Sequence, residues 1–169
     1  MLRISKLADY GTVVMVQIAS APYRLHTAAE VAEEVGVPLP TVSKLLKGLA
    51  RQGLVVSKRG ALGGYRLARP PEEITIGHVI TALEGPVAVT ACSDGDGLCD
   101  HEESCATRIP WIRVNQIVQE ALDGVTLADM VAALPGRGGA CGSPNPDPST
   151  HRLDLAPPEG GQAAGDDHE

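Results

Sequence analysis

Three short helical patterns followed by a glycine-rich hairpin pattern fill the first 70 residues, and this order constrains the fold more than any other feature. Between Ser5 and Pro22, apolar residues recur at helical spacing in SKLADYGTVVMVQIAS. The sequence TAAE at 27–30 has the form of a capping box, and the helical pattern that it opens stops at Gly36. The third pattern, TVSKLLKGLARQG at 41–53, has an apolar face formed by Val42, Leu45, Leu46 and Leu49.

The hairpin pattern is LVVSKRGALGGYRLA. Two runs of strand-forming residues, Leu54–Ser57 and Tyr65–Ala68, flank a glycine-rich turn. The turn presents Lys58 and Arg59 at its tip. Helices in this order followed by a β-ribbon predict a winged helix-turn-helix, so the expected fold class is mainly α with a small β-hairpin wing.

Two more helical patterns follow the hairpin. TIGHVITALEGP predicts a helix from about Thr75 to Glu84, and TLAD at 126–129 resembles a second capping box. Between them, a longer apolar repeat begins at Pro110. A long helix this apolar, placed after the main core elements, predicts a dimerisation element and therefore a homodimer. Its repeat is formed by Trp111, Val114, Val118, Ala121, Leu122 and Val125.

The charges are divided unevenly along the chain. Residues 1–69 hold ten Lys and Arg against four Asp and Glu, a net charge of +6, and residues 70–169 hold four against seventeen, a net charge of −13. A basic N-terminal module joined to an acidic remainder indicates a nucleic-acid partner. Arg59 stands beside glycines, as does an arginine that enters the minor groove of DNA, and Lys58 precedes it.

The outward face of the third helical pattern carries short and basic side chains. Thr41, Ser43 and Lys44 are suited to reach base edges in the major groove. Lys47 and Arg51 are suited to contact phosphates farther along the same helix. The alternative interpretation is a solvated polar face. Because a wing and a positive charge accompany this face, we expect it to bind double-stranded DNA.

The composition argues against several other classes of protein. The chain has no Phe, one Trp and three Tyr, so the core must be aliphatic and aromatic platforms for base stacking are not expected. No apolar run approaches the roughly 18 residues of a spanning helix, and no signal peptide is recognisable, so we expect a cytoplasmic protein. No Ser/His/Asp set, carboxylate pair or phosphate loop suggests an enzyme.

Three cysteines crowd into CSDGDGLCDHEESC, at 92–105. Clustered thiols in a reducing compartment are more often metal ligands or redox groups than disulfides. The spacing C-x6-C-x5-C differs from the paired knuckles of structural zinc, and the glycine-rich intervals suit a loop that folds around an ion or cluster. The expected ligands are Cys92, Cys99 and Cys105, whereas Cys141 is expected to be an unpaired thiol of the tail.

Three thiolates leave a four-coordinate site one ligand short. The fourth ligand could come from His101, Glu102 or Glu103 in the same loop, or from elsewhere in the chain. A zinc site with three Cys and one His, a reversible disulfide and unligated thiols are the alternatives.

Taken together, these segments resemble the IscR and NsrR type of bacterial winged-helix regulators, and within it the regulators of the SUF operon for iron–sulfur cluster assembly. The resemblance rests on LADYG, on the wing RGALGGYRLAR, on ITIGHVITALEGP, on the three cysteines and on the W-x3-N and TLADM segments. It runs from residue 1 to about residue 134.

The resemblance implies a homodimer whose long C-terminal helices cross, with one winged helix of each subunit on half of a palindromic operator. It implies that Ser43 and Lys44 read the groove and that Arg59 enters the minor groove. The implied cofactor is an iron–sulfur cluster, for which we expect the 2Fe-2S type, with 4Fe-4S as the alternative. Its implied ligands are Cys92, Cys99 and Cys105.

The fourth ligand is where this chain departs from the resemblance. Regulators of iron–sulfur assembly have a histidine three residues after the last cysteine, where this chain has Arg108. Nitric-oxide-sensing relatives use an aspartate near the start of the first helix, contributed by the partner subunit, and Asp9 stands at the matching position. We therefore rank Asp9 first, His101 second and an acidic loop residue third.

The expected protein is thus a cluster-sensing transcription regulator that represses a SUF operon. The alternatives are a nitric-oxide-sensing or redox-sensing repressor of the same kind, or a zinc-bound or metal-free winged-helix regulator. We expect a DNA-binding domain at 1–70, a cluster-binding loop and dimerisation helices at 71–134, and a disordered acidic tail at 135–169.

Overall fold

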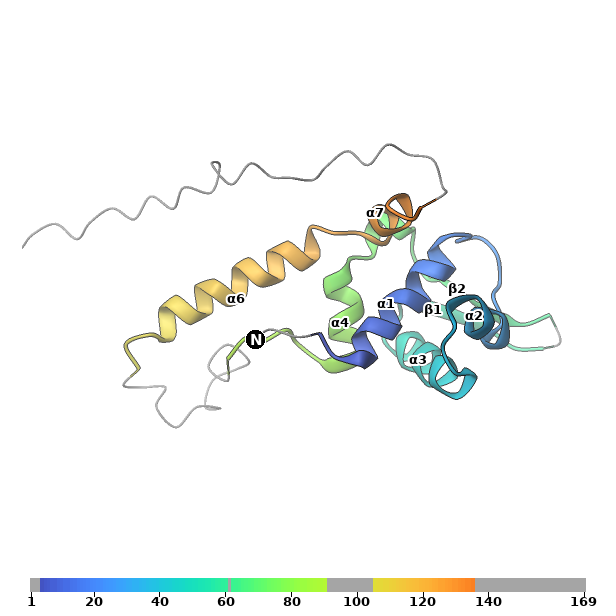
Figure 1. Cartoon of the computed structure of the whole chain (residues 1–169), viewed down its shortest axis with the longest axis horizontal. Helices are drawn as coiled ribbons and strands as arrows, with labels where there is room; N and C mark the ends of the chain where they lie inside the picture. The colour runs from blue at the N-terminus through green and yellow to red at the C-terminus, as the bar shows by residue number, and fades with distance from the viewer. Residues whose placement is uncertain (1–3, 61, 91–104, 136–169) are drawn as a thin grey trace, which may run out of the picture. The chain divides into compact units, whose positions relative to one another are not determined.

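The structure is a computed structural model that describes residues 4–60, 62–90 and 105–135 (Figure 1). Most of the cysteine-rich segment and the expected disordered tail lie outside the described residues. The elements are α1 (Lys6–Ala19), α2 (Ala28–Val35), α3 (Leu39–Arg51), β1 (Val55–Lys58), β2 (Gly64–Leu67), a 3-10 turn (Pro71–Glu73), α4 (Ile76–Glu84), α6 (Arg108–Asp123) and α7 (Leu127–Ala132).

The predicted helix ends are formed by local hydrogen bonds. The Ser5 hydroxyl accepts from the amides of Leu7 and Ala8 and so caps α1. Thr27 forms the predicted capping box before α2. Gly36 ends that helix with a φ of 68°, a conformation that favours glycine. The capping box at Thr126 is likewise present, so these predictions are confirmed.

Several predicted boundaries are shifted. The helix expected from Thr41 begins at Leu39, because a proline is compatible with the first turn, where its missing N–H is not needed. The helix expected from Pro110 begins at Arg108. The strands pair antiparallel in the register Val55 with Leu67 and Lys58 with Gly64, one residue from the predicted bounds. The fold class, mainly α with a hairpin wing, is confirmed.

Aliphatic side chains fill the core, as the composition predicted. The central helix is α1, which packs against α2, α3, α4 and α7. Leu83 of α4 lies between two glycines, since a Cβ at Gly11 would overlap its Cδ1 and one at Gly48 would be 3.7 Å from its Cδ2. The largest fully buried aliphatic side chains and Met are Val14, Met15, Ile18, Val31, Val42, Leu45, Leu46, Leu49, Val55, Ile74 and Leu127.

The end of α6 is joined to the start of α4. The Thr75 hydroxyl donates to Asp123 at 3.0 Å, and the Ile76 amide donates to the Val125 carbonyl at 2.9 Å. The Leu127 amide donates to the Ile74 carbonyl at 2.8 Å. These bonds place the α6–α7 junction beside the first turn of α4. Over the described residues, no helix has the length and apolar character to cross a membrane.

Candidate functional site

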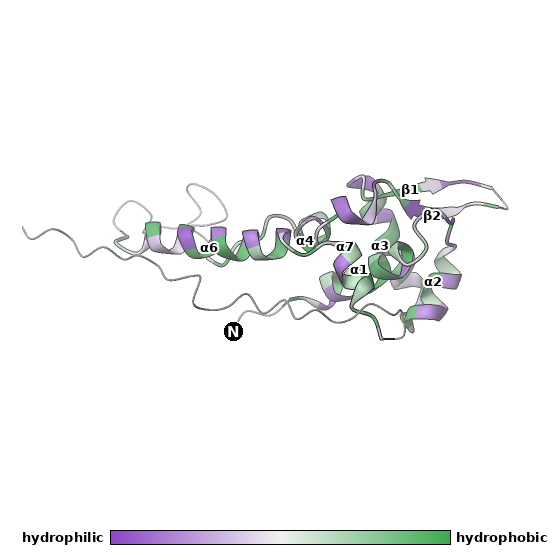
Figure 2. Ribbon diagram, turned by 90° about the horizontal axis from the view of Figure 1, so that it is seen from above, coloured by the Kyte–Doolittle hydropathy of each residue, from purple (hydrophilic) through white to green (hydrophobic). Residues whose placement is uncertain are grey.

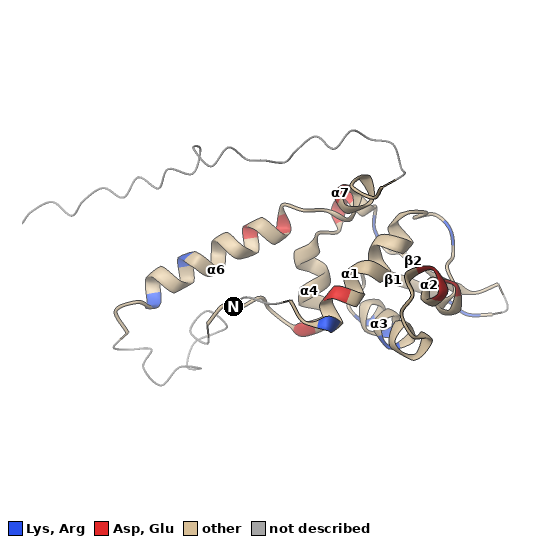
Figure 3. Cartoon of the chain, in the orientation of Figure 1, with Lys and Arg blue, Asp and Glu red and all other residues tan. Residues whose placement is uncertain are grey.

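The outer face of α3 carries the predicted recognition residues. Because the apolar side chains of α3 face the core, Lys44, Lys47 and Arg51 are exposed, and Thr41 and Ser43 are half-buried. Figure 3 shows basic residues on this helix. A cavity of about 600 Å³ lies along it, lined by basic side chains of α3 and by apolar side chains that include Leu7 and Leu83.

The wing presents the second group of basic side chains. Lys58 ends β1 and is exposed, as is Arg59 after it. Gly60 follows with a φ of 116°, in the left-handed region where a side chain would be strained, so the turn requires glycine there. All seven predicted DNA-contacting residues are therefore at least partly accessible, on one helix and one hairpin that pack together.

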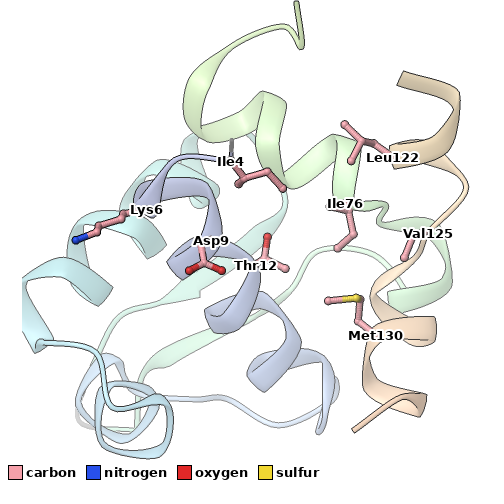
Figure 4. A pocket seen from close by; sticks show the side chains of 8 residues that line it. All are labelled: Ile4, Lys6, Asp9, Thr12, Ile76, Leu122, Val125 and Met130. Atoms are coloured by element: carbon pink, nitrogen blue, oxygen red, sulfur yellow. The ribbon is translucent and has the colours of Figure 1, made fainter. Parts of the chain in front are cut away.

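Asp9 is exposed in the first turn of α1. Its carboxylate lines a cavity of about 540 Å³ between α1 and the elements α4, α6 and α7 (Figure 4). Apart from Asp9 and Lys6, the cavity is lined mainly by apolar side chains, and the lining consists of Ile4, Lys6, Asp9, Thr12, Ile76, Leu122, Val125 and Met130.

Cys105 lies just before α6. Its thiol is 3.3 Å from the Thr107 hydroxyl. Hydrogen bonds from that hydroxyl, and from the backbone of Thr107 and Arg108, lower the pKa of the Cys105 thiol. Cys92, Cys99, His101 and Cys141 lie outside the described residues. Within the described ranges, no three His, Cys, Asp or Glu side chains gather closely enough to hold a metal ion.

Asn115 and Gln119 of α6 bind the backbone of the segment that leads from α4 to the cysteines. The Val89 amide donates to Asn115 Oδ1 at 3.0 Å, and Gln119 Nε2 donates to the Val87 carbonyl at 3.0 Å. Asn115 is also the only buried residue of α6. Sequence reasoning noted W-x3-N as part of a resemblance but did not assign this role, because the bond joins residues 26 positions apart.

The outer face of α6 carries large apolar side chains that the described part of the chain leaves partly exposed. Trp111, Val114 and Ile117 are 40%, 41% and 44% exposed. In Figure 2, hydrophobic and hydrophilic segments alternate along this helix. An apolar stripe on a helix is normally buried against another element.

A further residue was missed entirely by sequence reasoning. His26 was assigned no role, yet it is buried and its backbone pairs with Tyr65 of the wing. A single histidine between two helical patterns gives no periodic signal, so only the tertiary structure reveals this contact.

Comparison with known proteins supplies the family. A family model described as "Rrf2: Iron-dependent Transcriptional regulator" matches residues 4–133. The chain belongs to the Rrf2 family. As an Rrf2-family transcription regulator with a winged helix, it is a DNA-binding protein, and the predicted resemblance to regulators of this kind is confirmed.

Relatives support the Rrf2 assignment over most of the chain. The HTH-type transcriptional regulator IscR of Erwinia tasmaniensis is 31% identical over 136 residues, covering 77% of this chain and 79% of that protein. The structure of CymR, the global cysteine regulator of B. subtilis, is similar with a TM-score of 0.65 at 35% identity, covering 79% of this chain and 99% of that one. The structure of T. potens IscR is similar with a TM-score of 0.61 at 33% identity, covering 77% of this chain and 86% of that one. The first two are named as regulators.

Proposed function

We propose that this Rrf2-family protein binds double-stranded operator DNA as a homodimer, senses an iron–sulfur cluster and represses a SUF-type operon. The observation that supports the DNA interface is the exposed row of Lys44, Lys47 and Arg51 on α3, which packs beside the wing. The observations that support sensing are the three clustered cysteines, of which Cys105 lies just before α6, and the match to a family described as iron-dependent transcriptional regulators. Because the proposed partner is DNA, we place the protein in the cytoplasm.

The DNA interface divides into two kinds of contact. On α3, Thr41, Ser43 and Lys44 are proposed to reach base edges, and Lys47 and Arg51 to contact phosphates. On the wing, Arg59 is proposed to enter the minor groove, with Lys58 on the adjacent backbone. These residues are at least partly accessible, as such contacts require.

The donors of the chain fit an iron–sulfur cluster. Protein thiolates are the usual ligands of cluster iron, and hydrogen bonds that favour the thiolate of Cys105 favour the binding form. Cys92, Cys99 and Cys105 would supply three ligands. The fourth would be Asp9 of the partner subunit, with His101 as the alternative. A bound cluster, 2Fe-2S rather than 4Fe-4S in our proposal, would supply a redox-sensitive link between these residues.

Asp9 has a position from which such a link would affect DNA binding. It lies on the first turn of α1, and α1 packs against both α3 and α4. If Asp9 ligates the cluster of the other subunit, the placement of α3 relative to its counterpart depends on cluster occupancy. A ligand that prefers one of two such placements shifts the equilibrium between them.

The first test is the metal content of protein purified without oxygen. Iron, acid-labile sulfide and the visible absorbance are measured on the wild type, on Cys105→Ser and on Cys141→Ser. We expect sulfide and structured absorbance in the wild type and in Cys141→Ser, and their loss in Cys105→Ser. A colourless wild type that holds zinc or no metal after anaerobic reconstitution would contradict the proposal.

The fourth ligand has its own test. Asp9→Ala is expected to keep the fold and the dimer but to lose its cluster faster in air than the wild type, because one ligand is replaced by solvent. Glu33→Ala, at an exposed carboxylate of α2, is the matched control. Equal stability of the absorbance in Asp9→Ala and the wild type would remove Asp9 from the site.

The phosphate contacts are tested by salt dependence. Lys47→Ala is expected to weaken binding to all duplexes and to reduce the slope of log affinity against log salt by about one unit. Arg113→Ala removes an exposed charge from α6 as the control. Ser43 and Lys44 substitutions are expected to change which operator is preferred. An unchanged slope in Lys47→Ala would remove it from the phosphate contacts.

A thiol-based regulator without iron is the second candidate. It is favoured by the similarity to CymR, described as a cysteine regulator, and by the lowered pKa of Cys105. A nitric-oxide sensor would still contain iron, and a zinc-bound form would contain zinc without sulfide. The metal and sulfide assay therefore separates the iron-free and zinc-bound forms from the two iron-containing ones.

A further inference from the structure

The wing is attached to the helix-turn-helix by a third, single-residue strand. The His26 amide donates to the Tyr65 carbonyl at 2.8 Å, and the Tyr65 amide donates to the His26 carbonyl at 2.8 Å. The hairpin itself has only four residues in each strand. Because an isolated two-stranded hairpin is marginally stable in water, the pairing with His26 contributes to its order.

The His26 ring fixes the position of this third strand. The ring is buried, with 1% of the residue exposed. Arg24 Nη2 is 3.3 Å from His26 Nδ1, and a guanidinium can only donate, so Nδ1 is the acceptor. His26 Nε2 therefore carries the proton and donates to the Ala21 carbonyl at 3.1 Å. Arg24 Nη2 in turn forms a salt bridge with Glu30 Oε1 of α2, at 2.7 Å.

The backbones of Gly64 in the wing and of His26 approach closely where the wing meets the third strand. A Cβ at Gly64 would lie 2.7 Å from the His26 carbonyl oxygen, closer than side chains tolerate. Gly64 is paired with Lys58 across the hairpin, and Arg59 follows Lys58. The junction therefore lies one strand away from the basic residues of the wing.

We propose that His26 is a positioning residue for DNA binding: its ring and its pairing with Tyr65 fix the direction in which the wing presents Lys58 and Arg59. His26 does not itself contact DNA in this proposal, since its ring is buried and both ring nitrogens have protein partners. The proposal rests on the proposed function of Arg59 in the minor groove.

The first experiment tests the junction without DNA. Amide hydrogen exchange is followed by NMR in the wild type, His26→Leu, His26→Gln and Tyr23→Ala. In His26→Leu we expect fast exchange at Tyr65 and along β1 and β2, with unchanged protection in α1 and α3. A glutamine amide can still donate to the Ala21 carbonyl, so His26→Gln should retain part of the protection.

Tyr23→Ala is the matched control, because Tyr23 lies in the same connection and is 91% exposed. It should exchange like the wild type. Wild-type protection of the hairpin in His26→Leu would overturn the proposal. Equal loss of protection in the hairpin and the helices, in both His26 variants, would also overturn it, because the residue would then support the whole fold and not the wing.

The second experiment is a double-mutant cycle on a duplex selected from random sequence by the wild-type protein. His26→Leu is expected to weaken binding about fivefold, the effect of about one lost hydrogen bond. The same substitution should have little effect in an Arg59→Ala background and its full effect in a Lys47→Ala background. Equal weakening in both backgrounds would overturn the proposal.

The two experiments separate the proposal that His26 orders the wing from the proposal that Arg59 enters the minor groove. If Arg59→Ala alone leaves affinity unchanged, the proposed minor-groove contact is wrong, and the exchange experiment still decides whether His26 orders the wing.

Discussion

At the scale of single residues, Leu83 joins α4 to α1 and to α3. It lies against Gly11 on one side and Gly48 on the other, and neither neighbour has a side chain. The two glycines differ in the space that they leave. This difference permits a matched test of packing in which the same chemical change is made at both positions.

Gly11→Ala is expected to lower the free energy of unfolding by up to about 2 kcal/mol, because the repacking of Leu83 Cδ1 forced by the added methyl outweighs the gain of about 1 kcal/mol from alanine's helix preference. Gly48→Ala should raise it by up to about 1 kcal/mol, because its methyl is 3.7 Å from Leu83 and alanine favours the helix. Chemical denaturation of both variants measures the effect. Equal stability changes would contradict the difference in packing.

Cys105 permits a second prediction at the residue scale. Because hydrogen bonds from Thr107 lower its pKa, its thiolate persists to lower pH than that of an ordinary cysteine. In a metal-free variant with Cys105 as the sole cysteine, the pH midpoint of alkylation should lie below the ordinary thiol value. Thr107→Val should raise the midpoint, and unfolding in denaturant should return it to the ordinary value. Identical midpoints for the folded and the denatured protein would contradict this cause.

At the scale of elements, local signals in the sequence were sufficient to predict the helices and the hairpin. The caps at Thr27 and Thr126, the stop at Gly36 and the apolar faces depend on residues at most a few positions apart, so the sequence reveals them. The contacts of His26 with Tyr65, and of Asn115 with Val89, join distant positions through polar groups that have no periodicity. Such contacts could be found only in the folded chain.

The bond between Asn115 and Val89 predicts a role for the connection before the cysteines. Asn115→Ala leaves the Val89 amide without its acceptor and should lower the free energy of unfolding by about 1–2 kcal/mol. If the cluster proposal is correct, it should also shorten cluster retention in air, because Cys92 follows this segment by three positions. Gln116→Ala, at an exposed position of α6, is the control. Wild-type stability in Asn115→Ala would show that the bond is not needed.

At the scale of the whole molecule, the proposed homodimer would account for both the partly exposed apolar stripe on α6 and the single winged helix of each chain. The exposed Trp111, Val114 and Ile117 form an apolar surface that a second copy can cover. A two-fold dimer would then present two recognition helices, and a palindromic operator would match that symmetry. A monomer would keep its fold but bind only half of such an operator.

Val114→Glu tests this explanation, with Gln116→Glu as the control that adds the same charge on the exposed polar side of α6. A carboxylate buried in an apolar interface is strongly unfavourable, so Val114→Glu should sediment as a monomer while the wild type and Gln116→Glu sediment as dimers. Affinity for a palindromic duplex should fall about 100-fold in Val114→Glu, because the second half-site is no longer bound by a linked subunit. Affinity for a single half-site should not change, because α3 and the wing are intact. A dimeric Val114→Glu protein would exclude the α6 stripe as the interface, and a monomeric variant with undiminished affinity for the palindrome would show that dimerisation does not contribute to operator binding.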